Sequence, residues 1–133
     1  MPHLTLEYSS NLADDDSIGL LCHRLARTLD AQREGEKRAY PLGGIRVRAV
    51  PCDEYCIADG TVADAAFLHG TLKIGSGRSE SAKKATGDSL FEVIKQHFAE
   101  LFNTQGLALS LEIAEFSEAG TWKHNNLHAR LQC

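Results

Sequence analysis

The chain lacks an excess of positive charge, and this absence excludes one broad class of function. Its 133 residues contain 14 Lys and Arg against 18 Asp and Glu, so the formal net charge at pH 7 is −4. General nucleic-acid binding needs a basic surface that displaces counterions from phosphate groups. We therefore expect no nucleic-acid partner, although a local cationic pocket for a small acidic molecule is compatible with this charge balance.

Long apolar runs and a secretory signal are also missing. No uncharged stretch approaches the ~20 apolar residues that a membrane-spanning helix needs. The first ten residues, MPHLTLEYSS, have no basic start followed by an apolar block. We expect a cytoplasmic protein with no membrane partner, folded as a single domain over residues 1–133.

Cysteine is scarce and scattered along the chain. The four are Cys22, Cys52, Cys56 and Cys133, and three residues separate Cys52 from Cys56 where a CxxC pair has two. A zinc site needs more soft ligands at closer spacing, so the sequence predicts no metal site. Cys22 falls on the apolar stripe of an expected helix and is interpreted as a small core residue, and the other three are interpreted as ordinary thiols.

The hydrophobic pattern predicts the same strand–helix–strand unit twice. Strands are assigned where apolar and polar residues alternate, and helices where apolar residues recur at steps of three and four. The first unit comprises a strand at 2–8, a helix over 18–29 capped by Asp14, Asp15 and Asp16, a polar stretch at 32–38, a turn at 41–44 and a strand at 45–50. A connection at 51–64 joins the two units; it contains an Asp59-Gly60 turn and room for a short strand at 55–57. The second unit comprises a strand at 65–74, a helix at 79–103 ended by Gly106, and a strand at 107–116. A mixed tail at 118–133 follows it.

These two units predict an α/β fold built as a double βαβ unit. Each unit forms a right-handed crossover with its two strands parallel, and side by side they give a four-stranded mixed sheet with two helices on one face. No further segment is long enough to cover the other face of the sheet. The sequence therefore predicts self-association, with the tail at 118–133 in contact with a neighbouring subunit.

Pro2 has two interpretations. A proline in second place is a stiff start to a strand. If Met1 is removed, its nitrogen becomes a secondary amine, the only proline nitrogen of the chain able to take a proton. Burial and nearby positive charge lower the pKa of an α-amine from its usual ~8, which suits a base that moves protons between carbon and oxygen atoms.

Arginines occur at two places that favour anion binding. Arg46 and Arg48 are two apart on a strand and point the same way, so they form either a solvated face or a carboxylate clamp. Arg78 lies in Gly75–Ser79, between a strand and a helix start, where free N–H groups attract anions. A tight turn with an exposed arginine is the alternative there. Glu80 occupies the third glycine position of a GxGxxG pattern, and an acid at that point disfavours pyrophosphate binding.

The histidines do not form a convincing metal site in the sequence. His124 and His128 are four apart but have no third ligand at matching spacing. His97 falls on the apolar face of the second helix and is interpreted as a hydrogen-bonded core or interface residue. The pattern assigns no role to His69.

Six blocks of sequence match the pattern of a known family in the same order, from Pro2 almost to the last residue. They are Met1–Leu4, Gly44–Arg48, Asp59–Gly60, Leu72–Ser79, Leu109–Ile113 and Lys123–Ala129. Together they resemble the 5-carboxymethyl-2-hydroxymuconate Δ-isomerases of the tautomerase superfamily. The resemblance implies a homotrimer of double βαβ subunits. It also implies a 1,3-proton shift on an unsaturated dicarboxylate or tricarboxylate dienol of 4-hydroxyphenylacetate (homoprotocatechuate) degradation.

The resemblance further implies roles for individual residues. Pro2 is the catalytic base and then the acid, Arg46 and Arg78 are the pocket arginines, and Arg48 aligns with a further substrate-binding arginine. No metal and no organic cofactor is implied. The stretch 32–38 is longer and more charged than the family pattern. It precedes the strand that carries Arg46, so we expect the mouth of the pocket to differ in shape from that of other family members.

Two alternatives to this function stay open. One is a tautomerase-fold enzyme of different specificity, such as a decarboxylase, hydratase or dehalogenase that acts on another unsaturated acid. The other is an oligomer that binds small carboxylates without turning them over. Retention of Met1 in the natural protein would favour the binding function, because the Pro2 nitrogen would then be an amide.

Overall fold

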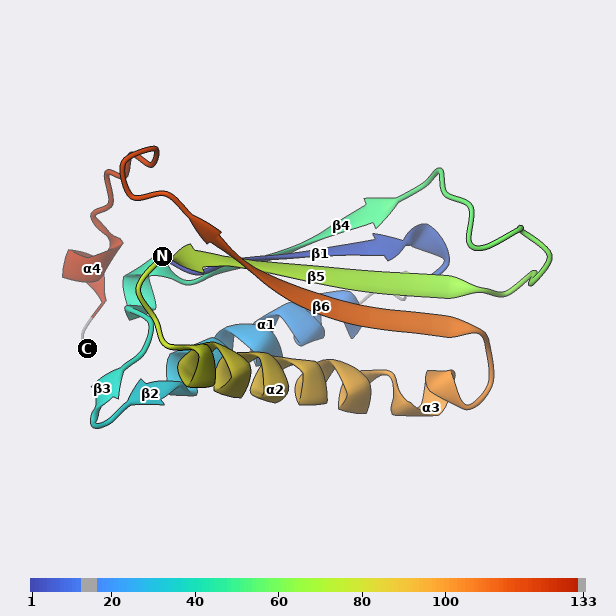
Figure 1. Cartoon of the computed structure of the whole chain (residues 1–133). Helices are drawn as coiled ribbons and strands as arrows, with labels where there is room; N and C mark the ends of the chain where they lie inside the picture. The colour runs from blue at the N-terminus through green and yellow to red at the C-terminus, as the bar shows by residue number, and fades with distance from the viewer. Residues whose placement is uncertain (13–16, 132–133) are drawn as a thin grey trace.

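The computed structural model describes residues 1–12 and 17–131, and its centre is a four-stranded sheet (Figure 1). The strands of this sheet are β1 (His3–Ser9), β4 (Arg46–Cys52), β5 (Ala66–Gly75) and β6 (Leu107–Phe116). Two helices, α1 (Ser17–Ala31) and α2 (Glu80–His97), lie on the same side of the sheet. The expected capping acids Asp14, Asp15 and Asp16, and Cys133, lie outside the described residues.

The order of the strands is β4-β1-β5-β6. β1 is parallel to β4 and β5 is parallel to β6, while the two central strands, β1 and β5, are antiparallel. Each parallel pair is joined through one helix, so the predicted double βαβ unit and mixed sheet are confirmed. The sheet register places His3 opposite Arg46 on one side and opposite Lys73 on the other.

The core forms between the sheet and the two helices. Alternate residues of the strands point toward the helices, and the apolar stripes of α1 and α2 meet them. The fully buried side chains of this cluster include Leu4, Leu6, Leu21, Leu25, Leu29, Leu68, Leu72, Ile74, Leu90 and Ile94. Each buried leucine contributes about 1.5–3 kcal/mol relative to exposure. Cys22 is half-buried and packs against the edge of the cluster rather than inside it.

The opposite face of the sheet is left uncovered by the described residues, and most of its side chains are polar, although Val50, Phe67, Ala108 and Ala114 also lie on it. The register places on this face the charged and hydrogen-bonding side chains His3, Thr5, Glu7, His69, Thr71, Lys73, Ser110 and Glu112. His69 donates or accepts a hydrogen bond of 2.7 Å with Ser110 Oγ, and its Nε2 lies 3.6 Å from Glu112 Oε1. The face that lacks a cover therefore has cross-strand polar pairs where an apolar surface would otherwise be expected.

The predicted long helix at 79–103 is wrong at its C-terminal part. α2 ends at His97, and Phe98 leaves helical geometry with φ −106° and ψ 16° before the short helix α3 (Ala99–Phe102). The side chain of Phe98 is buried in the core and stacks edge-on against the ring of His97, with 4.9 Å between the ring centroids. His97 also hydrogen-bonds to Ser17 Oγ at 2.8 Å, which agrees with its interpretation as a hydrogen-bonded residue.

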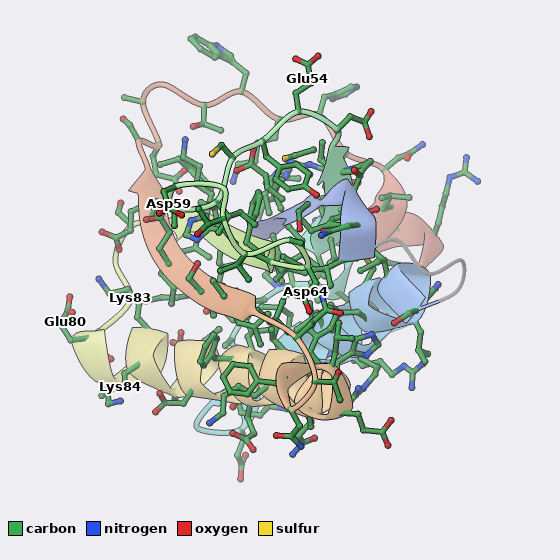
Figure 2. The ribbon with its side chains drawn as sticks, turned by 90° about the vertical axis from the view of Figure 1, so that its right-hand side faces the viewer. Glu54, Asp59, Asp64, Glu80, Lys83 and Lys84 are labelled. Atoms are coloured by element: carbon green, nitrogen blue, oxygen red, sulfur yellow. The ribbon has the colours of Figure 1, made fainter. Side chains whose placement is uncertain are left out.

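The connection between β4 and β5 contains no strand in its described residues 53–65, so the short strand considered at 55–57 is absent. Positive φ angles of 56° at Ala58 and 79° at Gly60 turn the chain instead. The carboxylate of Asp59 accepts hydrogen bonds from the N–H and hydroxyl of Thr61, at 3.1 and 2.7 Å, as the predicted turn requires. Figure 2 shows this end of the molecule, with Glu54, Asp59 and Asp64 on the connection.

The opposite end of the sheet collects the N-terminus, the hairpin β2 (Arg33–Glu34) and β3 (Lys37–Arg38), the 3₁₀ turn η2 (Leu42–Gly44) and the tail helix α4 (Leu127–Arg130) (Figure 1). The stretch 32–38, expected only to be polar, is thus an ordered hairpin.

Within residues 1–12 and 17–131, no helix is both long and apolar enough to cross a membrane. The same residues include no group of three or more His, Cys, Asp or Glu side chains arranged to hold a metal ion.

Candidate active site

The candidate site lies at the end of the sheet where the chain begins. Pro2 is buried just ahead of β1, and its carbonyl accepts a hydrogen bond of 3.0 Å from the backbone N–H of Arg46. The chain packs so closely here that a Cβ on Gly44 would lie 3.2 Å from Cγ of Met1. The glycine permits this approach, which brings the N-terminus beside the start of β4.

A cavity of about 600 Å³ opens next to the N-terminus. The start of the sheet forms one side and the tail after β6 forms the other; the lining residues are Met1, His3, Arg46, Phe116 and residues 121–127. Asn125 fixes the tail at this point, because its Nδ2 donates to the carbonyl of Gly43 at 3.0 Å and its Oδ1 accepts from the N–H of Leu127 at 2.6 Å. The tail therefore packs on its own subunit here, and its expected contact with a neighbouring subunit stays a prediction.

Arg46 brings a positive charge to the wall of the cavity. Its Nη1 donates to the carbonyls of Gly43 and Ile45, at 2.9 and 3.1 Å, which fixes one edge of the guanidinium. Arg48 lies two residues further along β4 on the open face of the sheet, outside the cavity lining. Its Nη1 lies 3.3 Å from Nδ1 of His3, so it contacts a residue that lines the cavity. Burial, and then the charges of Arg48 and Arg46, lower the pKa of His3.

Arg78 lies close to the site but is turned toward other groups. Its Nη2 donates to the carbonyl of Ala39 at 2.8 Å, its Nη1 donates to the carbonyl of Gly75 at 3.3 Å, and its guanidinium lies 4.5 Å from the centre of the Tyr40 ring. The turn that carries it needs a glycine at position 77, where φ is 112°. Arg78 does not line the cavity beside the N-terminus. It is therefore a neighbour of the cavity, whereas Arg46 is part of its wall.

The α-amine at the chain terminus has the electrostatic environment expected of a base at neutral pH. Burial is the main cause that lowers the pKa of the Met1 α-amino group, followed by the positive charges of Lys123, Arg78 and Arg46. Glu118 opposes these effects. An amine with a lowered pKa is unprotonated over more of the neutral range and can accept a proton.

Sequence reasoning singled out residues 124–128 of the tail as a segment that could carry chemistry, but it gave no role at this site to Trp122 or Lys123. Lys123 lies within a block that matches the family, but nothing in its local pattern separated it from an ordinary exposed lysine. Trp122 also lines the cavity although 88% of its surface is exposed. His124 lies in the cavity lining. His128 packs against Gly43, where a Cβ added to the glycine would lie 2.7 Å from Nδ1 of His128. A large exposed aromatic beside a lysine and paired asparagines was the available signal.

The arrangement suits a small anionic molecule. A cavity walled by Arg46 and Lys123 offers two cations, and Asn125 and Asn126 offer amide groups. Guanidinium and ammonium groups bind carboxylates and stabilise negative charge that develops on a reacting oxygen. A base, cations and hydrogen-bond donors at one cavity can support proton transfer on an unsaturated acid.

Comparison with known proteins assigns the chain to a family. A model of the family described as 5-carboxymethyl-2-hydroxymuconate isomerase matches residues 2–131. The chain is 41% identical over 129 residues to a 5-carboxymethyl-2-hydroxymuconate Delta-isomerase from Escherichia coli, covering 97% of this chain and 98% of that protein.

A solved structure of high identity gives the same result, and a distant one shares only the fold. The crystal structure of a 5-carboxymethyl-2-hydroxymuconate isomerase from Deinococcus radiodurans R1 superposes with a TM-score of 0.87 at 51% identity, covering 97% of this chain and 92% of that one. A fused 4-OT described as a symmetric trimer shares the fold, with a TM-score of 0.68 at 9% identity over 91% of this chain and 92% of that one. The chain therefore belongs to the 5-carboxymethyl-2-hydroxymuconate isomerase family.

Proposed function

We propose that this isomerase catalyses a 1,3-proton shift on an unsaturated dicarboxylate or tricarboxylate dienol, with the nitrogen of Pro2 as base and then acid. The observation that carries the proposal is the place of Pro2, which is buried just ahead of β1 and hydrogen-bonded to the backbone of Arg46, beside a cavity with Arg46 and Lys123 in its wall. The E. coli relative is named for 5-carboxymethyl-2-hydroxymuconate, and that compound is the substrate we propose. The pathway of 4-hydroxyphenylacetate breakdown follows from the same resemblance.

The proposed steps need only groups of this chain. After loss of Met1, the Pro2 amine removes a proton from the substrate, and the electron pair of the broken bond moves into the conjugated system. Negative charge collects on the substrate oxygen and carboxylates, where Arg46 and Arg78 stabilise it. The protonated Pro2 nitrogen then returns the proton two atoms away, which relocates the double bond. Arg48 is proposed to add attraction for the substrate from the open face, and no metal or organic cofactor takes part.

The pH dependence tests the base directly. Burial and the charges of Lys123, Arg78 and Arg46 lower the pKa of the Met1 α-amine, and the nitrogen of Pro2 is its neighbour in the chain. We therefore expect kcat/KM of the processed protein to rise with pH through a midpoint below the ~8 of an exposed α-amine. Spectrophotometric assays of the processed protein with the carboxymethyl-hydroxymuconate dienol would measure this profile. A profile without an ionisation in that range, or no turnover of the dienol, would contradict the proposal and favour simple carboxylate binding or another unsaturated acid.

We also propose that the protein is a cytoplasmic homotrimer. One face of the sheet has no cover within the described chain, and β4 and β6 are edge strands with unpaired backbone groups on their outer sides. A second and third copy would satisfy these groups, and the tail at 118–133 is proposed to contact one of them. Light scattering should give the mass of a trimer at micromolar concentration. A stable monomer under those conditions would contradict this prediction.

A further inference from the structure

The β2–β3 hairpin is the part of the chain that the proposed function leaves unexplained. Arg33 pairs with Arg38 and Glu34 with Lys37, and Gly35 makes the turn with φ 64°. The N–H of Ala39 donates to the carbonyl of Gln32 at 2.9 Å and closes the base of the hairpin. The ion pair between Arg38 Nε and Asp30 Oδ1, at 3.3 Å, anchors it to the end of α1. The hairpin is therefore held in place.

This hairpin and the residues that follow it surround the guanidinium of Arg78. The carbonyl of Ala39 accepts from Nη2 and the ring of Tyr40 lies beneath the guanidinium carbon. The third contact comes from Glu34, whose Oε1 lies 3.7 Å from Nε of Arg78. The segment 34–40 thus supplies a carboxylate, a carbonyl and an aromatic face to Arg78, which is far from it in sequence.

The Nε–H of Arg78 is a buried donor that has no hydrogen-bond partner among the described residues. Nη1 and Nη2 each donate to a carbonyl, but the Nε atom is buried and has no hydrogen-bond partner among the described residues. The carboxylate of Glu34 faces this atom from slightly beyond hydrogen-bond distance. The side chain of Glu34 is half exposed, whereas that of Arg78 is only 18% exposed. The carboxylate can therefore move aside while the arginine stays fixed.

We propose that Glu34 is a specificity-determining residue, whose carboxylate occupies the free edge of Arg78 and competes with a carboxylate of the substrate. The inference rests on the proposed function in taking Arg78 as a substrate-binding group. A carboxylate that approaches Arg78 has to displace Glu34 or remain beside it, and like charges at such a distance repel. The hairpin thereby weakens the attraction of the site for a highly charged anion.

Replacement of Glu34 separates this role from a purely structural one. In Glu34→Gln the repulsion disappears while the side chain keeps its size, so the dissociation constant for a tricarboxylate should fall about two- to fivefold, which is the effect of one ion pair near the protein surface. If Glu34 instead served only to hold Arg78, the same change would weaken binding. Glu36→Gln is the matched control, because Glu36 carries the same charge at the exposed turn of the same hairpin.

Calorimetric titration of propane-1,2,3-tricarboxylate into the wild type and both variants, at low ionic strength, gives the test. This probe has no double bond to move, so the measurement does not depend on turnover. Tighter binding in Glu34→Gln alone supports the proposal. Equal or weaker binding, an equal gain in Glu36→Gln, or no binding by any of the three proteins overturns it.

A second readout follows from the charges that face the terminal amine, which are Lys123, Arg78, Arg46, Glu118 and His3. Removing the carboxylate that screens Arg78 should lower the midpoint of the kcat/KM profile and reduce KM, while kcat stays unchanged where Pro2 is unprotonated. If the wild type does not turn over the dienol, the proposed function fails while the calorimetric result still decides the role of Glu34. If the wild type is active and Glu34→Gln binds the probe as the wild type does, only the role of Glu34 fails.

Discussion

Protein that retains Met1 should show no dienol isomerisation above background, whereas the processed protein should be fully active. In the retained form the Pro2 nitrogen belongs to an amide, and its lone pair is delocalised into the peptide bond. The α-amine of Met1 has a lowered pKa, but it is displaced by one residue from the position that the prolyl nitrogen takes after processing. A displacement of that size costs most of the benefit of a positioned base.

The comparison uses two preparations that differ only at the terminus, each verified by mass spectrometry. Pro2→Ala is the informative variant within the processed form, because a primary amine replaces the secondary one and some activity should survive. Equal rates with and without Met1 would show that another group moves the proton. Pro2 would then be no more than the rigid residue ahead of β1.

The sequence was sufficient for the fold because one face of each strand packs against the helices, fully buried in β1 and β5 and partly buried in the edge strands β4 and β6. The alternation that places Leu4, Leu6 and Tyr8 on one side of β1 is the same alternation that buries them against the helices. Periodicity did not locate the end of the second helix. Phe98 continues the apolar stripe of α2 in sequence and is buried in the core, yet α2 ends at His97 and the short helix α3 follows.

The candidate site was predicted only in part, because its geometry depends on pairs of residues far apart in the chain. Pro2 and Arg46 were singled out, and the register of β1 with β4 brings them together. The contacts of Arg78 with Glu34 and Ala39 join a turn after β5 to a hairpin after α1, and no local pattern encodes that. Lys123 reaches the amine only because Asn125 fixes the tail on Gly43.

Arg46→Ala and Arg78→Ala should each reduce kcat/KM by about 10²–10³, which corresponds to the ~2.7–4 kcal/mol typical of one lost oxyanion donor. Both variants remove a cation that is proposed to stabilise substrate carboxylates and that lowers the pKa of the Met1 α-amine. Lysine at either position should restore only part of the activity, because an ammonium group lacks the bidentate fork of the guanidinium. Arg48→Ala should have a smaller effect, since Arg48 is not among the cations that lower the pKa of the Met1 α-amine, whereas Arg46 and Arg78 are.

Steady-state kinetics with the dienol would measure these effects, and circular dichroism would verify that each variant is folded. The two alanine variants should also differ from one another. In Arg78→Ala the carboxylate of Glu34 loses its partner and repels the substrate, so adding Glu34→Gln should recover part of the loss. When Glu34→Gln is added to Arg46→Ala, kcat/KM should rise only by the factor that Glu34→Gln gives in the wild type. The side chain of Arg46 is held by the carbonyls of Gly43 and Ile45, and Glu34 contacts Arg78 instead. If both alanine variants kept the kcat/KM of the wild type, the proposed roles would be wrong. Arg46 would then be an ordinary residue of β4, and Arg78 an ordinary residue of the turn after β5.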